Sequence, residues 1–247
     1  MTALATVLHE WISAGLAFFY PEICQICKKC RARPAEGFVC PSCREGVEFI
    51  RPPFCSRCGK PVQGAITGDF ECTNCRQDEL HFETARSAVA TKGVVLEVIH
   101  RYKYQRALWF EPFLAGLLVQ EASPHLLPGD WDLLVPVPLH PTKERHREFN
   151  QSERLGRWLS KATGIPMETR LVSRVIPTQS QTRLDRKARQ ENMRNAFAMR
   201  RKRRLNGERI LLLDDVYTTG ATTSACARTL RKGGAAKVCV WTVARGV

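Results

Sequence analysis

The chain has 247 residues, of which 44% are hydrophobic, enough to bury a substantial core in one large domain or two small ones. Its net charge of +14 is uneven, because residues 141–209 carry 19 Lys and Arg against 7 Asp and Glu, whereas residues 1–84 carry 9 against 10. Polyanions such as nucleic acid or pyrophosphate are therefore the expected partners of the second part of the chain. The apolar run in the first 20 residues contains His9 and Glu10 and has no basic leader, so we expect neither a signal peptide nor a transmembrane segment.

An amphipathic helix is expected over residues 1–20. Apolar residues recur there at helical spacing, namely Leu4, Val7, Leu8, Trp11, Ile12 and Leu16. The polar face carries almost no Lys or Arg, which favours packing of this helix against the body of the protein over a place on a membrane surface.

The next region has a cysteine pattern typical of zinc binding. Eight cysteines form C-x-x-C pairs, which are Cys24 and Cys27, Cys40 and Cys43, Cys55 and Cys58, and Cys72 and Cys75. Each such turn presents two thiolates, so the pattern indicates two Zn²⁺ ions in two zinc ribbons. Because the thiolates fill every coordination position, we expect structural sites. The spacing leaves open whether the pairs combine sequentially or in a cross-braced way. Cys30 is left over, as a spectator or a replacement ligand.

Few aliphatic residues lie between these cysteines, so the metal ions must supply much of the folding free energy of this region. Thiolates stay available for zinc in a reducing compartment, which predicts a cytoplasmic protein. The expected organisation is an N-terminal amphipathic helix over residues 1–20, a double zinc ribbon over residues 21–82 and a further domain over residues 83–247.

The further domain is expected to begin with a strand at residues 85–90 and helical segments within residues 94–119. Inside these segments, residues 100–106 alternate aromatic rings with cations, which suits stacking on bases and contact with phosphates. An equally good alternative is the end of an amphipathic helix, at which Tyr102 and Tyr104 pack and Lys103 extends toward solvent.

A short apolar strand at residues 131–135 leads into a loop that contains Pro136, Pro138 and Pro141. Ligands of open parallel sheets bind just beyond the carboxyl ends of the strands, so we expect this loop to face a binding crevice. The other expected elements are a helical run after residue 150, a strand at residues 167–171 and a strand at residues 237–243.

Residues 210–222 carry the clearest functional signal. Four apolar residues predict a buried strand, Asp214 and Asp215 end it, and a turn rich in hydroxyl groups leads into a helix over residues 221–231. A helix N-terminus offers free N–H groups and partial positive charge, so the turn is a candidate phosphate cradle. Two adjacent carboxylates at the end of a buried strand indicate a cation or ligand hydroxyls in front of them. The alternative is a solvated strand end with threonines that cap the helix.

This stretch, an apolar run followed by Asp-Asp-x-x-Thr-Thr-Gly-x-Thr, resembles the phosphoribosyl pyrophosphate (PRPP) signature of type I phosphoribosyltransferases. The resemblance implies that the catalytic residues are Asp214 and Asp215, which hold the ribose 2- and 3-hydroxyls. It implies a 5-phosphate loop that consists of Thr218, Thr219, Gly220, Ala221 and Thr222.

Further motifs narrow the resemblance. Val-Pro-x-Pro at residue 135, Arg-x-Phe-Asn-Gln-Ser at residue 147, Gln-x-x-Leu-x-x-x-x-Arg at residue 181 and Asn-Ala-Phe at residue 195 follow the cysteine pairs. This combination is similar to the ComF (ComFC/GntX-like) family of competence-associated proteins, over nearly the whole chain. It implies an α/β fold, with a type I phosphoribosyltransferase-like open parallel sheet flanked by helices and preceded by a small double zinc-ribbon domain.

In phosphoribosyltransferases, a loop after an early strand takes the pyrophosphate, and a flexible basic loop closes over the site. By position, the resemblance assigns the pyrophosphate loop to Val135, Pro136, Val137 and Pro138. It assigns the flexible cover to a segment that includes Arg183, Arg186 and Arg189. Mg²⁺ is expected to bridge the ribose hydroxyls and the pyrophosphate of PRPP.

Two functions remain in view. The first is PRPP binding, with transfer of the phosphoribosyl group to an acceptor that the sequence does not identify. The second is non-catalytic binding of single-stranded DNA, in contact with the competence machinery and with a regulatory or vestigial PRPP site. The basic stretch 141–209, the aromatic run at residues 100–106 and the zinc ribbons favour this second function. The sequence decides neither turnover nor oligomeric state.

Overall fold

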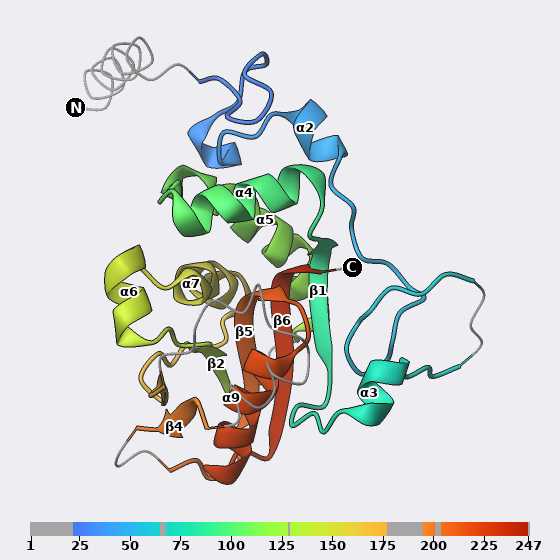
Figure 1. Cartoon of the computed structure of the whole chain (residues 1–247), viewed down its shortest axis with the longest axis vertical. Helices are drawn as coiled ribbons and strands as arrows, with labels where there is room; N and C mark the ends of the chain where they lie inside the picture. The colour runs from blue at the N-terminus through green and yellow to red at the C-terminus, as the bar shows by residue number, and fades with distance from the viewer. Residues whose placement is uncertain (1–21, 65–67, 128, 177–194, 201–203, 247) are drawn as a thin grey trace.

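The computed structural model describes residues 22–64, 68–127, 129–176, 195–200 and 204–246 (Figure 1). Its centre is a four-stranded sheet in the order β1-β6-β5-β2, in which every neighbouring pair is parallel. The strands are β1 (Ala85–Ala90), β2 (Leu133–Pro136), β5 (Arg209–Tyr217) and β6 (Lys237–Arg245). The expectation of an open parallel sheet is confirmed.

Helices cover both faces of this sheet. The helices are α4 (Gly93–Tyr104), α5 (Glu111–Ala122) and α7 (Gln151–Thr163) on one side and α9 (Ala221–Lys232) on the other. Leu211 and Leu213 of β5 project into the core shared with α5 and α7, whereas Ile210 and Leu212 project into the core shared with α9. The apolar run is continuous because both faces of this strand are buried.

Shorter elements complete the described part of the chain. These are α2 (Pro41–Glu45), α3 (Thr73–Gln77) and α6 (Pro141–Arg147), the 3-10 turns η1 (Pro34–Glu36), η2 (Leu108–Phe110) and η3 (Ser123–His125), and the strands β3 (Val172–Arg174) and β4 (Phe197–Met199). β3 and β4 form an antiparallel pair apart from the main sheet.

The two cysteine-rich segments lie against different parts of the body. Figure 1 shows the first beside α4 and the second, with α3, beside β1. The chain between them runs along β1, where the Ile50 amide donates to the Ala88 carbonyl at 3.0 Å and the Ala90 amide donates to the Glu48 carbonyl at 2.8 Å. In each segment the second C-x-x-C pair begins a short helix, because Cys40 is the N-cap of α2 and Cys72 is the N-cap of α3.

β5 extends through both aspartates, whereas the sequence predicted that they end the strand. The reason is that β6 runs beside β5 as far as Arg245, which pairs with Tyr217. This added pairing keeps Asp214 and Asp215 in extended backbone at the carboxyl end of the sheet.

The strand predicted at residues 167–171 is wrong. Met167 makes a single bridge to Leu134, and the strand β3 begins at Val172. β3 is set by its antiparallel partner β4, which lies far along the chain and leaves no local pattern in the sequence.

Two predicted segments lie outside the described residues. They are the N-terminal helix over residues 1–20 and the basic cover with Arg183, Arg186 and Arg189. Within the described ranges, no helix has the length and apolar character needed to cross a membrane.

Candidate functional site

The paired cysteines form two clusters of four sulfur atoms. The first contains Cys24, Cys27, Cys40 and Cys43, and the second contains Cys55, Cys58, Cys72 and Cys75. Sulfur atoms of opposite pairs lie 3.7 or 3.8 Å apart in both clusters. Tetrahedral zinc with Zn–S bonds of about 2.3 Å places its ligands about 3.8 Å apart, so the clusters fit two structural zinc sites. The pairs combine sequentially, and Cys30 is exposed and belongs to neither cluster.

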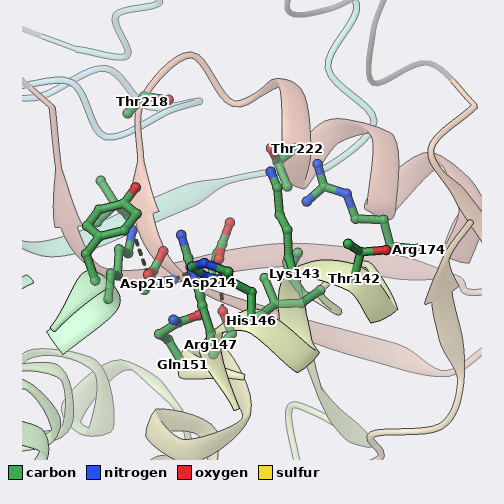
Figure 2. A pocket seen from close by; sticks show the side chains of 16 residues that line it. Thr142, Lys143, His146, Arg147, Gln151, Arg174, Asp214, Asp215, Thr218 and Thr222 are labelled. Atoms are coloured by element: carbon green, nitrogen blue, oxygen red, sulfur yellow. Dashed lines mark hydrogen bonds and ion pairs between the residues drawn. The ribbon is translucent and has the colours of Figure 1, made fainter. Parts of the chain in front are cut away.

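An open groove of about 590 Å³ lies at the carboxyl ends of β2 and β5. Its walls come from the end of α4, the loop after β2, α6, the first turn of α7, β3, and the end of β5 with the turn that follows. Of the residues predicted from the sequence, Asp214, Asp215, Val137, Thr218 and Thr222 line this groove (Figure 2). Segments that are far apart in the sequence therefore meet around the two aspartates.

Asp214 is the carboxylate with the most unusual environment. Its Oδ1 accepts a hydrogen bond of 2.9 Å from the Ser152 hydroxyl and one of 2.9 Å from the Asp215 amide. Burial, and then repulsion from the Asp215 carboxylate, raise the pKa of Asp214 to about 7, against the opposing effect of Lys103. Asp214 therefore exchanges a proton near neutral pH, and a bound cation or hydroxyl donor would favour its charged form.

Lys103 binds the second carboxylate. Its Nζ lies 2.7 Å from Asp215 Oδ2, and both side chains are largely buried. The three residues at the end of the aromatic and cationic run therefore have different environments. Tyr102 is buried, and its hydroxyl lies 3.1 Å from Glu111. Lys103 enters the groove, whereas Tyr104 is 58% exposed. Neither sequence interpretation placed Lys103 at the aspartates. The only local signal was its position beside the apolar face of α4.

Asn150 connects the proline-rich loop to α7. Its Nδ2 donates to the Val137 carbonyl at 3.1 Å, and its Oδ1 accepts from the Ser152 amide at 3.0 Å as the N-cap of α7. Ser152 then donates to Asp214 from the same turn. The Arg-x-Phe-Asn-Gln-Ser motif therefore holds together the loop after β2, the start of α7 and the end of β5.

Three further cations line the groove, of which the sequence pointed only to Arg147, as part of a family motif without a role. Lys143 and Arg147 lie on α6, and Arg174 lies on β3. In Figure 2, Lys143 and Arg174 project toward Thr222, whereas Arg147 lies by the aspartates. Burial, followed by repulsion from Arg174 and then Arg147, lowers the pKa of Lys143 to about 8. Cations gathered against their own repulsion mark a site for an anion.

The turn at residues 218–222, here called the hydroxyl turn, leads from β5 into α9. Gly220 is the N-cap of α9 with φ of +81°, a conformation that favours glycine. A side chain at this position would also collide with the hydroxyl of Tyr217, which packs directly under the turn. The Thr219 hydroxyl accepts from the Ala221 amide at 3.4 Å. Thr218 and Thr222 face the groove with the N-terminus of a twelve-residue helix behind them.

The proline-rich loop offers few donors of its own. Val135 and Pro136 belong to β2 and are buried, and Pro136 and Pro138 have no N–H group. The Val137 amide donates to the Leu213 carbonyl at 2.8 Å. This loop therefore directs the chain from β2 into α6, and the charged groups beside it come from α6.

Residues 15–79 match the family described as "Double zinc ribbon domain". The chain is 31% identical to Competence protein F of Haemophilus influenzae over 230 residues, which cover 89% of this chain and 96% of that protein. It is 30% identical to the DNA utilization protein YhgH of Salmonella typhimurium, over 91% of this chain and 97% of that protein. Competence protein ComFC of Bacillus subtilis is 28% identical, with 84% of each chain covered.

Two solved structures are similar to part of this chain. A purine phosphoribosyltransferase from Pyrococcus horikoshii is 14% identical and covers 56% of this chain and 83% of its own, with a TM-score of 0.33. An adenine phosphoribosyltransferase from Thermoanaerobacter pseudethanolicus is 15% identical, and the alignment covers 61% of this chain and 85% of that chain, with a TM-score of 0.34.

Proposed function

The chain belongs to the ComF family of competence proteins, and we propose that its groove binds PRPP together with Mg²⁺. The observation that carries the proposal is the meeting of three features around one groove of about 590 Å³. These are an acidic pair, a helix N-terminus with free hydroxyls, and a group of partly buried cations. A sugar that carries a phosphate at one end and a pyrophosphate at the other needs all three.

The acidic pair and the hydroxyl turn take the ribose 5-phosphate half of PRPP. Asp214 and Asp215 accept hydrogen bonds from the ribose 2- and 3-hydroxyls, and Ser152 and Lys103 hold the two carboxylates for this task. The hydroxyl turn surrounds the 5-phosphate with Thr218, backbone N–H groups and the positive end of α9.

Lys143 and Arg147 take the pyrophosphate, with Arg174 as the third cation. Both residues stand on α6, directly after the loop that the resemblance assigns to pyrophosphate. We assign the charge-bearing contacts to α6 because the prolines and the bonded Val137 amide leave the loop with few donors. Bound with PRPP, Mg²⁺ supplies charge neutralisation at the pyrophosphate oxygens.

Transfer of the phosphoribosyl group follows from the same contacts if an acceptor is present. The protein then has to fix the ribose, stabilise the departing pyrophosphate and keep water from the anomeric carbon. The test is a pyrophosphate-release screen with Mg-PRPP against a panel of nucleobases and single-stranded DNA. Release that depends on one acceptor would establish a transferase, and PRPP binding with no release above the blank for any acceptor would leave a binding protein.

A second role, binding of single-stranded DNA in the cytoplasm, is favoured by one observation at the mouth of the groove. Tyr104 is exposed, and the Arg147 guanidinium lies 5.1 Å from the centre of its ring. An exposed ring beside a cation suits stacking on unpaired bases. If this role is right, DNA affinity falls steeply with salt, and Tyr104→Ala lowers DNA affinity by a larger factor than it lowers Mg-PRPP affinity.

A further inference from the structure

The second cysteine cluster makes direct contact with the last residue of β6. Arg245 is 4% exposed, and its Nη1 donates to the Cys58 carbonyl at 2.5 Å. Its Nη2 lies 3.4 Å from Cys58 Sγ, which is one of the four sulfur atoms of the cluster. A guanidinium that donates to a thiolate ligand both fixes that ligand and balances its charge.

The same guanidinium covers the ring of Tyr217. Its carbon lies 4.6 Å from the ring centre, and the backbones of Arg245 and Tyr217 are paired across β6 and β5. Phe82 meets the ring edge-on at 6.2 Å. Tyr217 is 3% exposed, so its position is determined by these neighbours.

Tyr217 in turn supports the hydroxyl turn. Its side-chain hydroxyl packs against Gly220, where the turn enters α9. The Gly246 amide, next to Arg245, donates to the Tyr217 carbonyl at 2.9 Å. A continuous series of contacts therefore runs from Cys58 through Arg245 and Tyr217 to Gly220.

The segment that leaves the second cluster makes another contact with α9. Ser224 Oγ accepts from the His81 amide at 3.1 Å and lies 3.4 Å from the Glu79 carbonyl. Arg57, between Cys55 and Cys58, donates to the Leu80 carbonyl at 2.9 Å. The second ribbon is thus attached to the first turn of α9 as well as to the end of β6.

We propose that Arg245 is a positioning residue through which the second zinc cluster holds the hydroxyl turn in the shape that binds phosphate. The zinc ribbon then serves as part of the support of the ligand site. This inference rests on the proposed role of the hydroxyl turn as the phosphate site. It also predicts that metal loss at the second cluster, but not at the first, weakens phosphate binding.

The first cluster offers a matched comparison. Arg101 Nη1 donates to the Gln25 carbonyl at 2.7 Å, and the Arg101 guanidinium lies 4.9 Å from the ring centre of Phe110. Arg101 therefore holds a zinc ribbon through a carbonyl and an aromatic ring, as Arg245 does, but on α4. Arg101→Met is consequently a control for general damage to a ribbon.

The experiment compares hydrogen exchange of the amides at residues 218–222 in ligand-free wild type, Arg245→Met, Arg245→Lys and Arg101→Met. Zinc release to a chelator is followed in the same samples. We expect Arg245→Met to speed zinc loss from one of the two sites and amide exchange in the hydroxyl turn by about tenfold or more. Arg245→Lys should have a smaller effect, and Arg101→Met should leave exchange in the turn unchanged.

Unchanged exchange in the turn of Arg245→Met would overturn the proposal, as would an equal increase in Arg101→Met. If Arg245→Met does not fold, the milder Arg245→Lys decides between the same two results. Because exchange is measured without ligand, this test does not depend on PRPP binding. Wild-type protein that fails to bind Mg-PRPP would instead refute the proposed function, whatever the exchange data show.

Discussion

Lys103 and Asp215 form an ion pair of 2.7 Å at the groove, and their side chains are only 17% and 14% exposed. The pair joins the end of α4 to the end of β5. Lys103 also lowers the pKa of Asp214, although burial and Asp215 raise it to about 7 overall. One lysine therefore pairs with Asp215 and favours the charged form of Asp214, the two residues that we assign to the ribose.

Replacement of this lysine should weaken ligand binding in a pH-dependent way. In Lys103→Met the pKa of Asp214 rises above about 7, so less of the charged form is present at neutral pH. A rise of one pKa unit from about 7 would lower Mg-PRPP affinity about fivefold at pH 7 and little at pH 9, as calorimetry can measure. Lys92→Met, which removes an exposed pair with Glu48, is the control. An equal loss at both pH values would contradict this explanation.

The raised pKa of Asp214 also predicts how stability varies with pH. The folded protein retains a proton on Asp214 up to pH of about 7, whereas an unfolded chain releases it near pH of about 4. This contribution to stability is complete below pH of about 4 and is lost as the pH rises through about 7. Thermal unfolding should therefore show Asp214→Asn gaining stability relative to wild type from pH 5 to pH 8. A difference in melting temperature between the two proteins that stays constant across that range would refute the raised pKa of Asp214.

Ligand binding has the opposite dependence, because the ribose and its metal require the charged carboxylate. Affinity for Mg-PRPP should rise from pH 6 to pH 8, with release of a proton on binding. Calorimetry in two buffers that differ in ionisation enthalpy measures this proton. Uptake of a proton on binding would contradict the proposed role of Asp214.

Two substitutions separate the two tasks of Asn150. Asn150→Ala removes both the cap of α7 and the contact with Val137, and should cost about 1–2 kcal/mol of unfolding free energy. Asn150→Asp keeps an oxygen for the cap but loses the donor to Val137. We expect the aspartate variant to retain most of the stability in urea unfolding and yet to bind pyrophosphate less well. Equal destabilisation by both variants would show that the cap of α7 is not the main contribution of Asn150 to the unfolding free energy.

The cations on α6 can be tested with inorganic pyrophosphate alone. Lys143→Met removes one charge-assisted contact and should lower pyrophosphate affinity by about tenfold, the effect of a hydrogen bond to a charged group. It should also reduce the dependence of affinity on salt. Lys161 is an exposed residue of α7 that does not line the groove. Lys161→Met therefore changes the net charge by the same amount and serves as the control. Equal losses in the two variants would mean that net charge, and not the groove, attracts the anion.

Local chemistry explains which parts of the site could be predicted. Asp214, Asp215 and the threonines of the hydroxyl turn are neighbours in sequence, and the order of strand, turn and helix places them without knowledge of the rest of the fold. The zinc sites could be predicted for the same reason, since each C-x-x-C turn is local and tetrahedral zinc needs two such pairs. The sequential pairing of the clusters needed the structure.

Contacts between distant segments could not be predicted in this way. Lys103 reaches Asp215 because α4 packs beside the end of β5, and Arg174 reaches the groove from a strand whose partner is more than twenty residues away. Arg245 stands at the end of the chain with no motif around it. Each depends on tertiary packing, which hydrophobic periodicity does not encode at the level of single side chains.

One titration decides whether the acidic pair binds the ribose of PRPP. Mg-PRPP is titrated by calorimetry into wild-type protein and into the double variant Asp214→Asn with Asp215→Asn, with circular dichroism and zinc content as checks on folding. We predict binding to wild type that requires Mg²⁺ and no detectable binding to the double variant, with both checks unchanged. The same affinity in both proteins would contradict the account.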